Sequence, residues 1–179
     1  MHMATNLKRW TLEELHRLPD DGNKYELVRG DLFVTPPPND GHETILARLT
    51  AVLTRYVLAQ QLGLIYHPRS VLRFEGSEVE PDLMVRMPAP GINNDWERAP
   101  RPILIVEVFS DSTRRRDEMD KRRLYADAAI DDYWMVDPEA RALTVVRPGA
   151  PDHLVTDAFE WNPRTASAPL VIRLAEIFG

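Results

Sequence analysis

The spacing of apolar and polar residues predicts a short helix and a hairpin in the first part of the chain. Thr11-Leu12-Glu13-Glu14 has the form of a capping box, in which threonine and glutamate side chains satisfy the first free N–H groups of a helix. A helix is therefore expected to begin at Leu12. Two short β-like runs, Tyr25–Val28 and Leu32–Thr35, flank Arg29-Gly30-Asp31, and this arrangement predicts a β-hairpin.

A long amphipathic helix and a series of strands are predicted next. Asp40-Gly41-His42-Glu43 again fits a capping box, and apolar residues at helical spacing continue to about Gln61, where Gly63 closes the helix. The segment 87–102 is rich in proline and is predicted to be a surface loop. Between the helix and this loop lie three β-like runs: Leu64–Tyr66, Val71–Phe74 and Val79–Val85.

The second half of the chain continues the alternation of strands and helices. Ile103–Phe109 is almost entirely apolar, which predicts a central strand covered on both faces. The residues after Gly149 are less regular until Leu170–Phe178. This order predicts one α/β domain over residues 1–179, with a core at about 10–147 and a C-terminal extension at 148–179. The remaining expected elements are a helix over about Arg114–Ala129 and strands at Tyr133–Asp137 and Leu143–Val146.

Composition narrows the class of protein. Hydrophobic residues make up 44% and charged residues 28% of the chain, which is typical of a soluble globular domain and excludes a disordered or fibrous one. The absence of cysteine excludes disulfides and thiolate sites. The longest apolar run, Ile103–Val106, is far shorter than the roughly 18 residues of a membrane span. With no signal peptide at the start, we expect a soluble cytoplasmic protein without a membrane partner.

The net charge of −6, from 22 basic and 28 acidic residues, argues against a passive nucleic-acid coat. It remains compatible with an enzyme whose carboxylates hold a metal ion. Two carboxylates stand out for this role. Glu107 lies inside an apolar strand, where an ionised carboxylate is costly unless a cation or donors compensate it. Asp82 follows Pro81 beside another apolar run.

Neighbouring strands that each deliver one carboxylate can hold a divalent cation, with the Val108 carbonyl as a further ligand. The simpler alternatives are that Glu107 pairs with an arginine and that Pro81-Asp82 is an ordinary turn. Lys121 shares the inward helix face with Leu124, so its amine either points at the two carboxylates or extends to the surface.

A basic run in the same helix is a candidate grip for phosphate groups. Residues 114–123 hold six basic and three acidic side chains, in contrast to the acidic chain as a whole. The alternative is a solvated helix face. The candidate nucleic-acid contacts are Arg114, Arg115, Arg116, Arg122 and Arg123.

Other titratable residues carry weaker signals. Glu26 in the hairpin could reach the site as a partner of the metal or its water, whereas His42 and Tyr125 are more typical of structural positions. The remaining histidines have no companion at zinc-ligand spacing, so a zinc hydrolase is not supported. The chain also has no Gly-x-Ser-x-Gly elbow and no glycine-rich phosphate loop.

Pro81-Asp82, Glu107-Val108-Phe109 and a following helix with Lys121 together resemble the PD-(D/E)XK superfamily of restriction-endonuclease-like nucleases. The chain is most similar to a bacterial endonuclease-like family long catalogued as a domain of unknown function, over roughly residues 10 to 147. Phe109 stands where the superfamily has lysine. The family supplies that lysine from the next helix, here Lys121. The other matching stretches are Tyr25–Asp31, His42, Ile105–Ser110, Lys121–Tyr125 and Tyr133–Asp137.

This resemblance implies a mixed four- or five-stranded sheet with helices on both sides and an activity that hydrolyses DNA phosphodiester bonds. Asp82, Glu107 and the Val108 carbonyl would bind Mg²⁺ or Mn²⁺, Lys121 would orient the attacking water or neutralise charge, and Glu26 would assist. No organic cofactor is expected. A homodimer is expected, because enzymes that cut both strands often pair two sites. The alternatives are an inactive nuclease fold acting as a dimeric adaptor and an interaction protein whose carboxylates are only salt-bridged.

Overall fold

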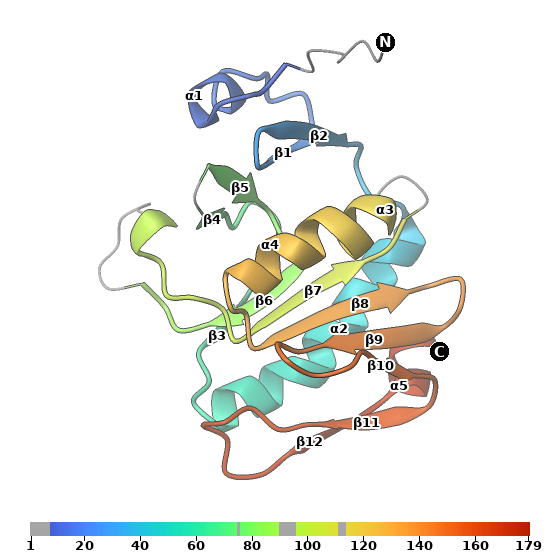
Figure 1. Ribbon diagram of the computed structural model, residues 1–179. Helices are drawn as coiled ribbons and strands as arrows, with labels where there is room; N and C mark the ends of the chain where they lie inside the picture. Colours follow the sequence, from blue (N-terminus) through green and yellow to red (C-terminus); the bar gives the residue numbers. More distant parts are fainter. Residues whose placement is uncertain (1–7, 75, 90–95, 111–113) are drawn as a thin grey trace.

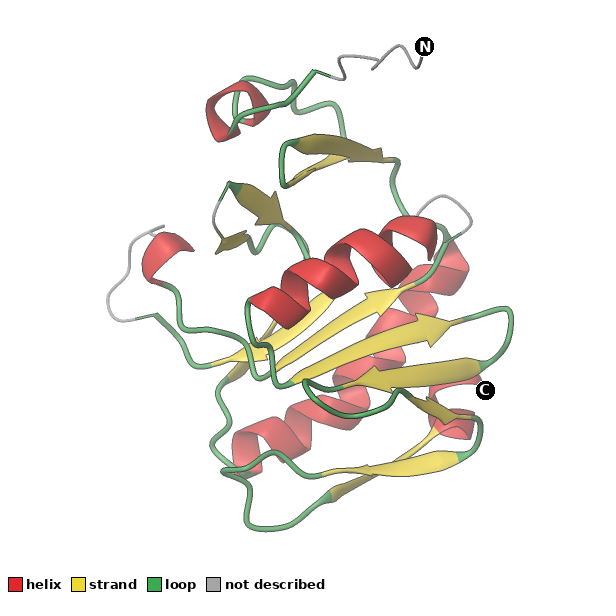
Figure 2. Cartoon of the chain, viewed as in Figure 1, coloured by secondary structure: helices red, strands yellow, loops and turns green. Residues whose placement is uncertain are grey.

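The structure is a computed structural model that describes residues 8–74, 76–89, 96–110 and 114–179. It contains a main sheet of six strands, a smaller sheet of four strands and a separate hairpin (Figure 1). Helices cover both faces of the main sheet (Figure 2). This mixed α/β architecture confirms the predicted fold class. The main sheet is wider than the four or five strands expected, since residues of the C-terminal extension add an edge strand.

The helices are α1 (Leu12–Leu15), α2 (Asp40–Ala59), α3 (Arg114–Arg116), α4 (Arg122–Asp127) and α5 (Leu174–Phe178), with a 3-10 turn η1 (Trp96–Arg98) and a π-helical segment η2 (Asp117–Lys121). The main sheet has the order β10-β9-β8-β7-β6-β3. Its strands are β3 (Leu64–Tyr66), β6 (Leu83–Arg86), β7 (Leu104–Val108), β8 (Asp132–Asp137), β9 (Ala142–Val146) and β10 (His153–Val155). The small sheet, in the order β2-β1-β5-β4, contains β1 (Lys24–Val28), β2 (Asp31–Thr35), β4 (Leu72–Phe74) and β5 (Ser77–Val79). The separate hairpin consists of β11 (Ala158–Trp161) and β12 (Leu170–Arg173).

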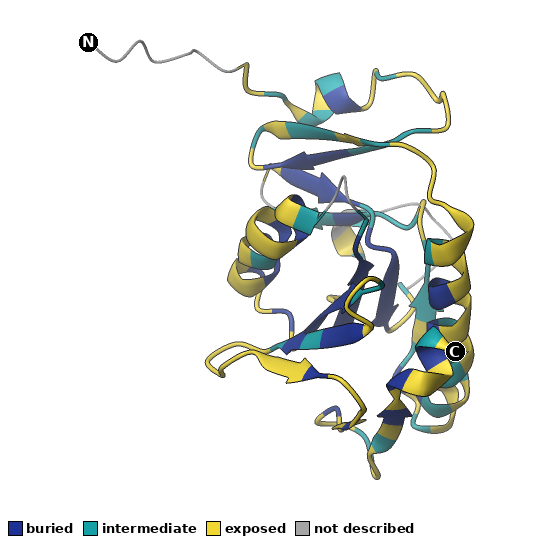
Figure 3. Ribbon diagram, turned by 90° about the vertical axis from the view of Figure 1, so that its right-hand side faces the viewer, coloured by how far each residue is buried: buried dark blue, intermediate teal, exposed yellow. Residues whose placement is uncertain are grey.

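The main sheet separates two hydrophobic clusters. One cluster joins α2, α5 and β11–β12 to one face of the sheet, and the other joins α4 and the small sheet to the opposite face. The strands between them are buried and the outer helix faces are exposed (Figure 3). β7 is buried along its whole length, as expected of a central strand, and pairs antiparallel with β6 and parallel with β8.

Local signals explain where the helices begin. Thr11 caps α1 and exchanges reciprocal hydrogen bonds with Glu14, which confirms the predicted capping box. The cap of α2 lies one residue earlier than predicted. The side chain of Asn39, and not that of Asp40, accepts the hydrogen bond from the His42 N–H. Among the described residues, no helix has the length and apolar character needed to cross a membrane.

The run predicted at Val79–Val85 is divided between the two sheets. β5 ends at Val79 in the small sheet, and β6 begins at Leu83 in the main sheet. Pro81 lies between them and has no N–H to donate to a ladder, which suits a crossing between sheets. Asp82 therefore lies at the point where the chain enters the main sheet.

The helix predicted over Arg114–Ala129 forms as three consecutive segments, α3, η2 and α4. The π-helical segment in the middle is a feature often found at functional sites. Asp117 and Lys121 of this segment are both buried, and their charged groups lie 3.7 Å apart.

The expectation that the chain after Gly149 is less regular until Leu170–Phe178 is wrong for the first part of this segment. β10 joins the main sheet, and β11 pairs with β12, which lies in the stretch expected to be regular. Trp161 and Ile172 of the hairpin and Ile177 of α5 are fully buried in the same cluster as α2. The Trp161 indole also donates a hydrogen bond to Asp132 at 3.1 Å. The C-terminal residues are thus part of the core.

Candidate functional site

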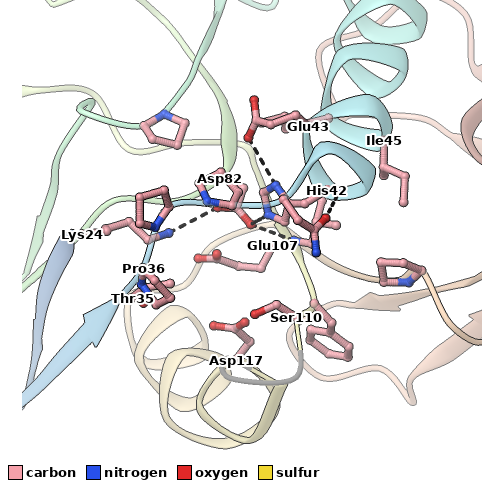
Figure 4. Close-up of a pocket in the computed structure, with 18 of the residues that line it drawn as sticks. Lys24, Thr35, Pro36, His42, Glu43, Ile45, Asp82, Glu107, Ser110 and Asp117 are labelled. Atoms are coloured by element: carbon pink, nitrogen blue, oxygen red, sulfur yellow. Dashed lines mark hydrogen bonds and ion pairs between the residues drawn. The ribbon is translucent and has the colours of Figure 1, made fainter. Parts of the chain in front are cut away.

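A cavity of about 810 Å³ opens between the β1–β2 hairpin, the start of α2 and the adjoining ends of β6 and β7. Asp82, Glu107, Val108 and Asp117 line it, together with Lys24 and His42 (Figure 4). These side chains come from segments far apart in the sequence. The cavity is therefore a product of the tertiary fold.

Asp82 and Glu107 meet through strand register. Leu83 of β6 pairs with Val106 of β7, so the next pair toward the cavity is Asp82 and Glu107. Residues opposite each other on neighbouring strands point to the same face of a sheet. The Val108 N–H also donates a hydrogen bond to Asp82 Oδ2 at 2.9 Å, which fixes the aspartate against β7. Both carboxylates are buried and line the cavity.

Asp82 is held between two further side chains. Lys24 Nζ lies 3.2 Å from Oδ1, and His42 Nε2 lies 3.1 Å from Oδ2. Burial alone would raise the pKa of Asp82, but the Lys24 ammonium and the His42 hydrogen bond hold it well below its usual value. Burial disfavours protonation of His42, but the hydrogen bonds and negative charges of Asp82 and Glu43 together outweigh it and raise the pKa of the imidazole. Asp82 is therefore ionised at neutral pH.

Glu107 has a different environment, although it is the immediate neighbour of Asp82. Lys121 Nζ lies 2.7 Å from Glu107 Oε1, and the Tyr125 hydroxyl donates to the same oxygen at 2.8 Å. Burial raises the pKa of Glu107 to about 7, because the attraction of Lys121 is offset by the negative charges of Asp82 and Asp117. Two adjacent carboxylates thus differ strongly in their affinity for protons.

A buried ionic network supports Glu107 from behind. Lys121 is fully buried and also lies 2.9 Å from Glu26, while Arg116 lies 3.2 Å from Glu26 and 3.3 Å from Asp117. Burial would raise the pKa of Glu26, but Lys121, Lys24 and Arg116 lower it to about 2. Glu26 Oε1 also accepts a hydrogen bond from the Glu80 N–H at 2.9 Å. The network fixes the inner end of the site.

Among the described residues, the ion pairs of this site contain more acidic side chains than lysine and arginine side chains, and His42 is a further partner of Asp82. They connect four acidic side chains with three permanently charged basic ones: Glu26, Asp82, Glu107 and Asp117 against Lys24, Arg116 and Lys121. Burial is the main cause of the raised pKa of Glu107, and the negative charges of Asp82 and Asp117 add to it. A cation bound beside Glu107 would favour its charged form.

The available donors suit a magnesium-type ion. Mg²⁺ is usually held by one or two carboxylates, with water and substrate phosphate oxygens completing its shell. Asp82 and Glu107 supply two such carboxylates, and Val108 lies beside them in the cavity wall. Within the described ranges, no group of three or more histidine, cysteine, aspartate or glutamate side chains is placed so that it could hold a metal ion. A cation here would therefore depend on the two carboxylates together with water and substrate oxygens.

The structure brings together four of the residues singled out from sequence as catalytic: Glu26, Asp82, Glu107 and Lys121. The five candidate arginines differ in their exposure and in their partners. Arg115 and Arg123 are exposed, whereas the Arg116 guanidinium is buried against Glu26 and so does not lie on the surface expected for it. Two others form bidentate ion pairs, Arg114 with Asp137 and Arg122 with Asp152.

Sequence reasoning missed Lys24 and Asp117 and gave His42 only a weak role. Lys24 is the first residue of β1, and nothing in the local pattern distinguishes it from an ordinary polar residue before a strand. Asp117 and Lys121 are four residues apart in one helix, a spacing that could have indicated a buried pair. The capping pattern around His42 correctly placed it near the start of α2, but only the fold places it against Asp82.

Comparisons with known proteins show which family the chain belongs to. The chain is similar to a protein from Anabaena variabilis, described as a "putative nuclease belonging to DUF820", with a TM-score of 0.77 and 21% sequence identity. The match covers 94% of this chain and 97% of that one, which shows a shared fold. No curated protein matches the chain. Residues 12–176 match the model of the Uma2 family, described as "Putative restriction endonuclease", and the chain therefore belongs to this restriction-endonuclease-like family, as the pattern of Asp82, Glu107 and Lys121 predicted.

Proposed function

We propose that this protein is a divalent-metal-dependent endonuclease that hydrolyses phosphodiester bonds in DNA. The observation that carries this proposal is the convergence of Asp82 and Glu107 from neighbouring strands in the wall of one cavity. The cluster of Asp82, Glu107 and Asp117 in the cavity wall supports it, because these carboxylates would repel an anionic substrate unless a cation were bound first. Membership of a nuclease-like family agrees with this reaction class.

Asp82, Glu107 and the Val108 carbonyl would hold Mg²⁺ or Mn²⁺. When bound, such an ion polarises the phosphoryl oxygen and lowers the pKa of a coordinated water. The Val108 N–H and His42 orient the Asp82 carboxylate, while Tyr125 and Lys121 orient that of Glu107. These contacts would keep both groups in place without rearrangement when substrate arrives.

Lys121 acts in this proposal as a positioning residue. Its side chain is fully buried among Glu26, Glu107 and Asp117, and it is not part of the cavity wall. It would therefore hold Glu107 instead of touching substrate. Glu26 in turn would hold Lys121.

The DNA backbone would be gripped outside the cavity by exposed arginines of the α3–η2–α4 helix. Arg115 and Arg123 are exposed and carry a permanent charge, which suits contact with phosphate groups. Arg114 lines the cavity and is already paired with Asp137, so it would contribute at the rim. Arg116 would stabilise the site from within.

The experiment is the nicking of supercoiled plasmid DNA with and without Mg²⁺ or Mn²⁺. We expect cleavage that requires the metal and is lost in Asp82→Asn and in Glu107→Gln. The matched controls are Asp31→Asn and Glu13→Gln, the same chemical changes at exposed side chains that pair with arginines at the surface. Binding of DNA without cleavage under any metal would reject the enzyme and favour an inactive adaptor with a nuclease fold.

A further inference from the structure

We propose that Lys24 is the catalytic amine of this site, and that its ammonium contacts a phosphate oxygen of the substrate during cleavage. This inference rests on the endonuclease function proposed above. It assigns to the first residue of β1 a role that the family resemblance implies for Lys121. Three observations carry it: the position of each lysine relative to the cavity, the number of acceptors that each amine already has, and the place of the Lys24 amine beside the two site carboxylates.

Only one of the two lysines at the site reaches the cavity. The chain has three lysines, Lys8, Lys24 and Lys121, and Lys8 is exposed and paired with Glu14. The Lys121 side chain is 0% exposed and does not line the cavity. The Lys24 side chain is 16% exposed and is part of the cavity wall. A phosphate group that enters the cavity can therefore meet Lys24, while Glu107 separates it from Lys121.

The two amines also differ in the acceptors around them. A lysine ammonium has three N–H donors. Lys121 is enclosed by three carboxylates, at 2.7, 2.9 and 3.7 Å. Lys24 has two acceptors among the described residues, Asp82 Oδ1 at 3.2 Å and the Glu80 carbonyl at 3.1 Å. One donor of Lys24 therefore remains for a ligand, and both of its existing contacts lie at the long end of the hydrogen-bond range.

The position of Lys24 suits the charge that develops in phosphodiester cleavage. Lys24 and His42 lie on opposite sides of Asp82, and the Glu107 carboxylate lies between Asp82 and Asp117 in the same view (Figure 4). The amine thus borders the place where two carboxylates would hold a cation and a phosphate. A fixed positive charge there stabilises negative charge on the phosphate.

Lys24 should also compete with a divalent cation for Asp82. Both are positive, and both use the same carboxylate. A neutral side chain at position 24 would remove the repulsion and leave Asp82 more available. The catalytic role therefore predicts two changes of opposite sign: slower cleavage and tighter metal binding. If Lys24 merely kept the site folded, its substitution would lower both the rate of cleavage and the affinity for the metal ion.

The test compares Lys24→Met and Lys24→Arg with wild type and with Lys8→Met, a matched change at an exposed lysine. The single-turnover rate of plasmid nicking at saturating Mn²⁺ is expected to fall about 100-fold in Lys24→Met, the scale of losing one donor to a developing anion. Lys24→Arg should recover part of the rate. Mn²⁺ affinity, measured by calorimetry without DNA, should rise about tenfold in Lys24→Met because one repulsive charge is removed.

Each outcome decides between the proposals. If wild type cleaves and Lys24→Met cleaves within about threefold of it, the role of Lys24 is rejected and the endonuclease function stands. If Lys24→Met loses Mn²⁺ binding as well as cleavage, Lys24 is structural and the inference fails. If wild type fails to cleave DNA with every metal ion tested, the endonuclease proposal fails and the inference with it. The calorimetry still reports whether Lys24 opposes the cation.

Discussion

Replacement of Glu26 by glutamine should make the protein less stable at neutral pH and less sensitive to acid. The ordinary pKa of a glutamate is 4.5, and in the folded protein that of Glu26 is about 2. This difference corresponds to about 3 kcal/mol of folding free energy at neutral pH. Because the folded pKa is depressed, the contribution is complete above pH 4.5 and is lost as the pH falls from 4.5 toward 2. Glutamine cannot supply it, since its amide N–H₂ would face Lys121 or Arg116.

Urea unfolding from pH 7 down to pH 3 measures this effect. We expect Glu26→Gln to lose about 3 kcal/mol at pH 7 and to show a shallower decline in stability below pH 4.5 than wild type. The control is Glu13→Gln, which alters an exposed glutamate paired with Arg17 and should leave both quantities unchanged. An acid limb identical to that of wild type, or a loss below about 1 kcal/mol at pH 7, would refute the reasoning.

Three further predictions concern the interior and the surface. Lys121→Met should lower the free energy of unfolding by about 3–5 kcal/mol, because it leaves buried carboxylates without their cation; unchanged urea unfolding would count against the network. Trp161→Ala should cost about 3–5 kcal/mol in the same assay if the C-terminal hairpin belongs to the core, and a near-neutral result would show that it does not. Arg115→Gln and Arg123→Gln should each lower the salt dependence of DNA binding by about one ion, measured by fluorescence anisotropy, and an unaltered slope would remove these residues from the interface.

Much of the fold can be predicted from local sequence patterns. The capping box at Thr11, the β1–β2 hairpin and the strand β7, which is apolar except for Glu107, all follow from residues that are close in sequence. The separation of β5 and β6 into different sheets depends on distant partners, which no local pattern specifies. β10 and β11 were missed because they have only three and four residues, too few for the alternation of buried and exposed positions in β11 to stand out.

Site residues can be predicted from the sequence where a charged side chain lies among apolar neighbours. Glu107 stands out because a charge inside an apolar strand requires compensation, and Lys121 because it lies on the apolar face of its helix. Lys24 has no such conflict in its local sequence, since a polar residue at the start of a strand is ordinary. For Arg116 the sequence pattern was misleading. It belongs to a basic run that is typical of an exposed surface, but in the fold its side chain is buried against Glu26.

The most direct measurement is the anomalous scattering of crystals grown with Mn²⁺. If Asp82 and Glu107 share one cation, a single strong peak should lie within about 2.5 Å of an oxygen of each carboxylate, the upper end of cation–oxygen distances in proteins. Crystals of Asp82→Asn grown in the same way should lack it. A saturating concentration of Mn²⁺ that produces no peak between these two side chains, or a peak bound elsewhere, would contradict the account.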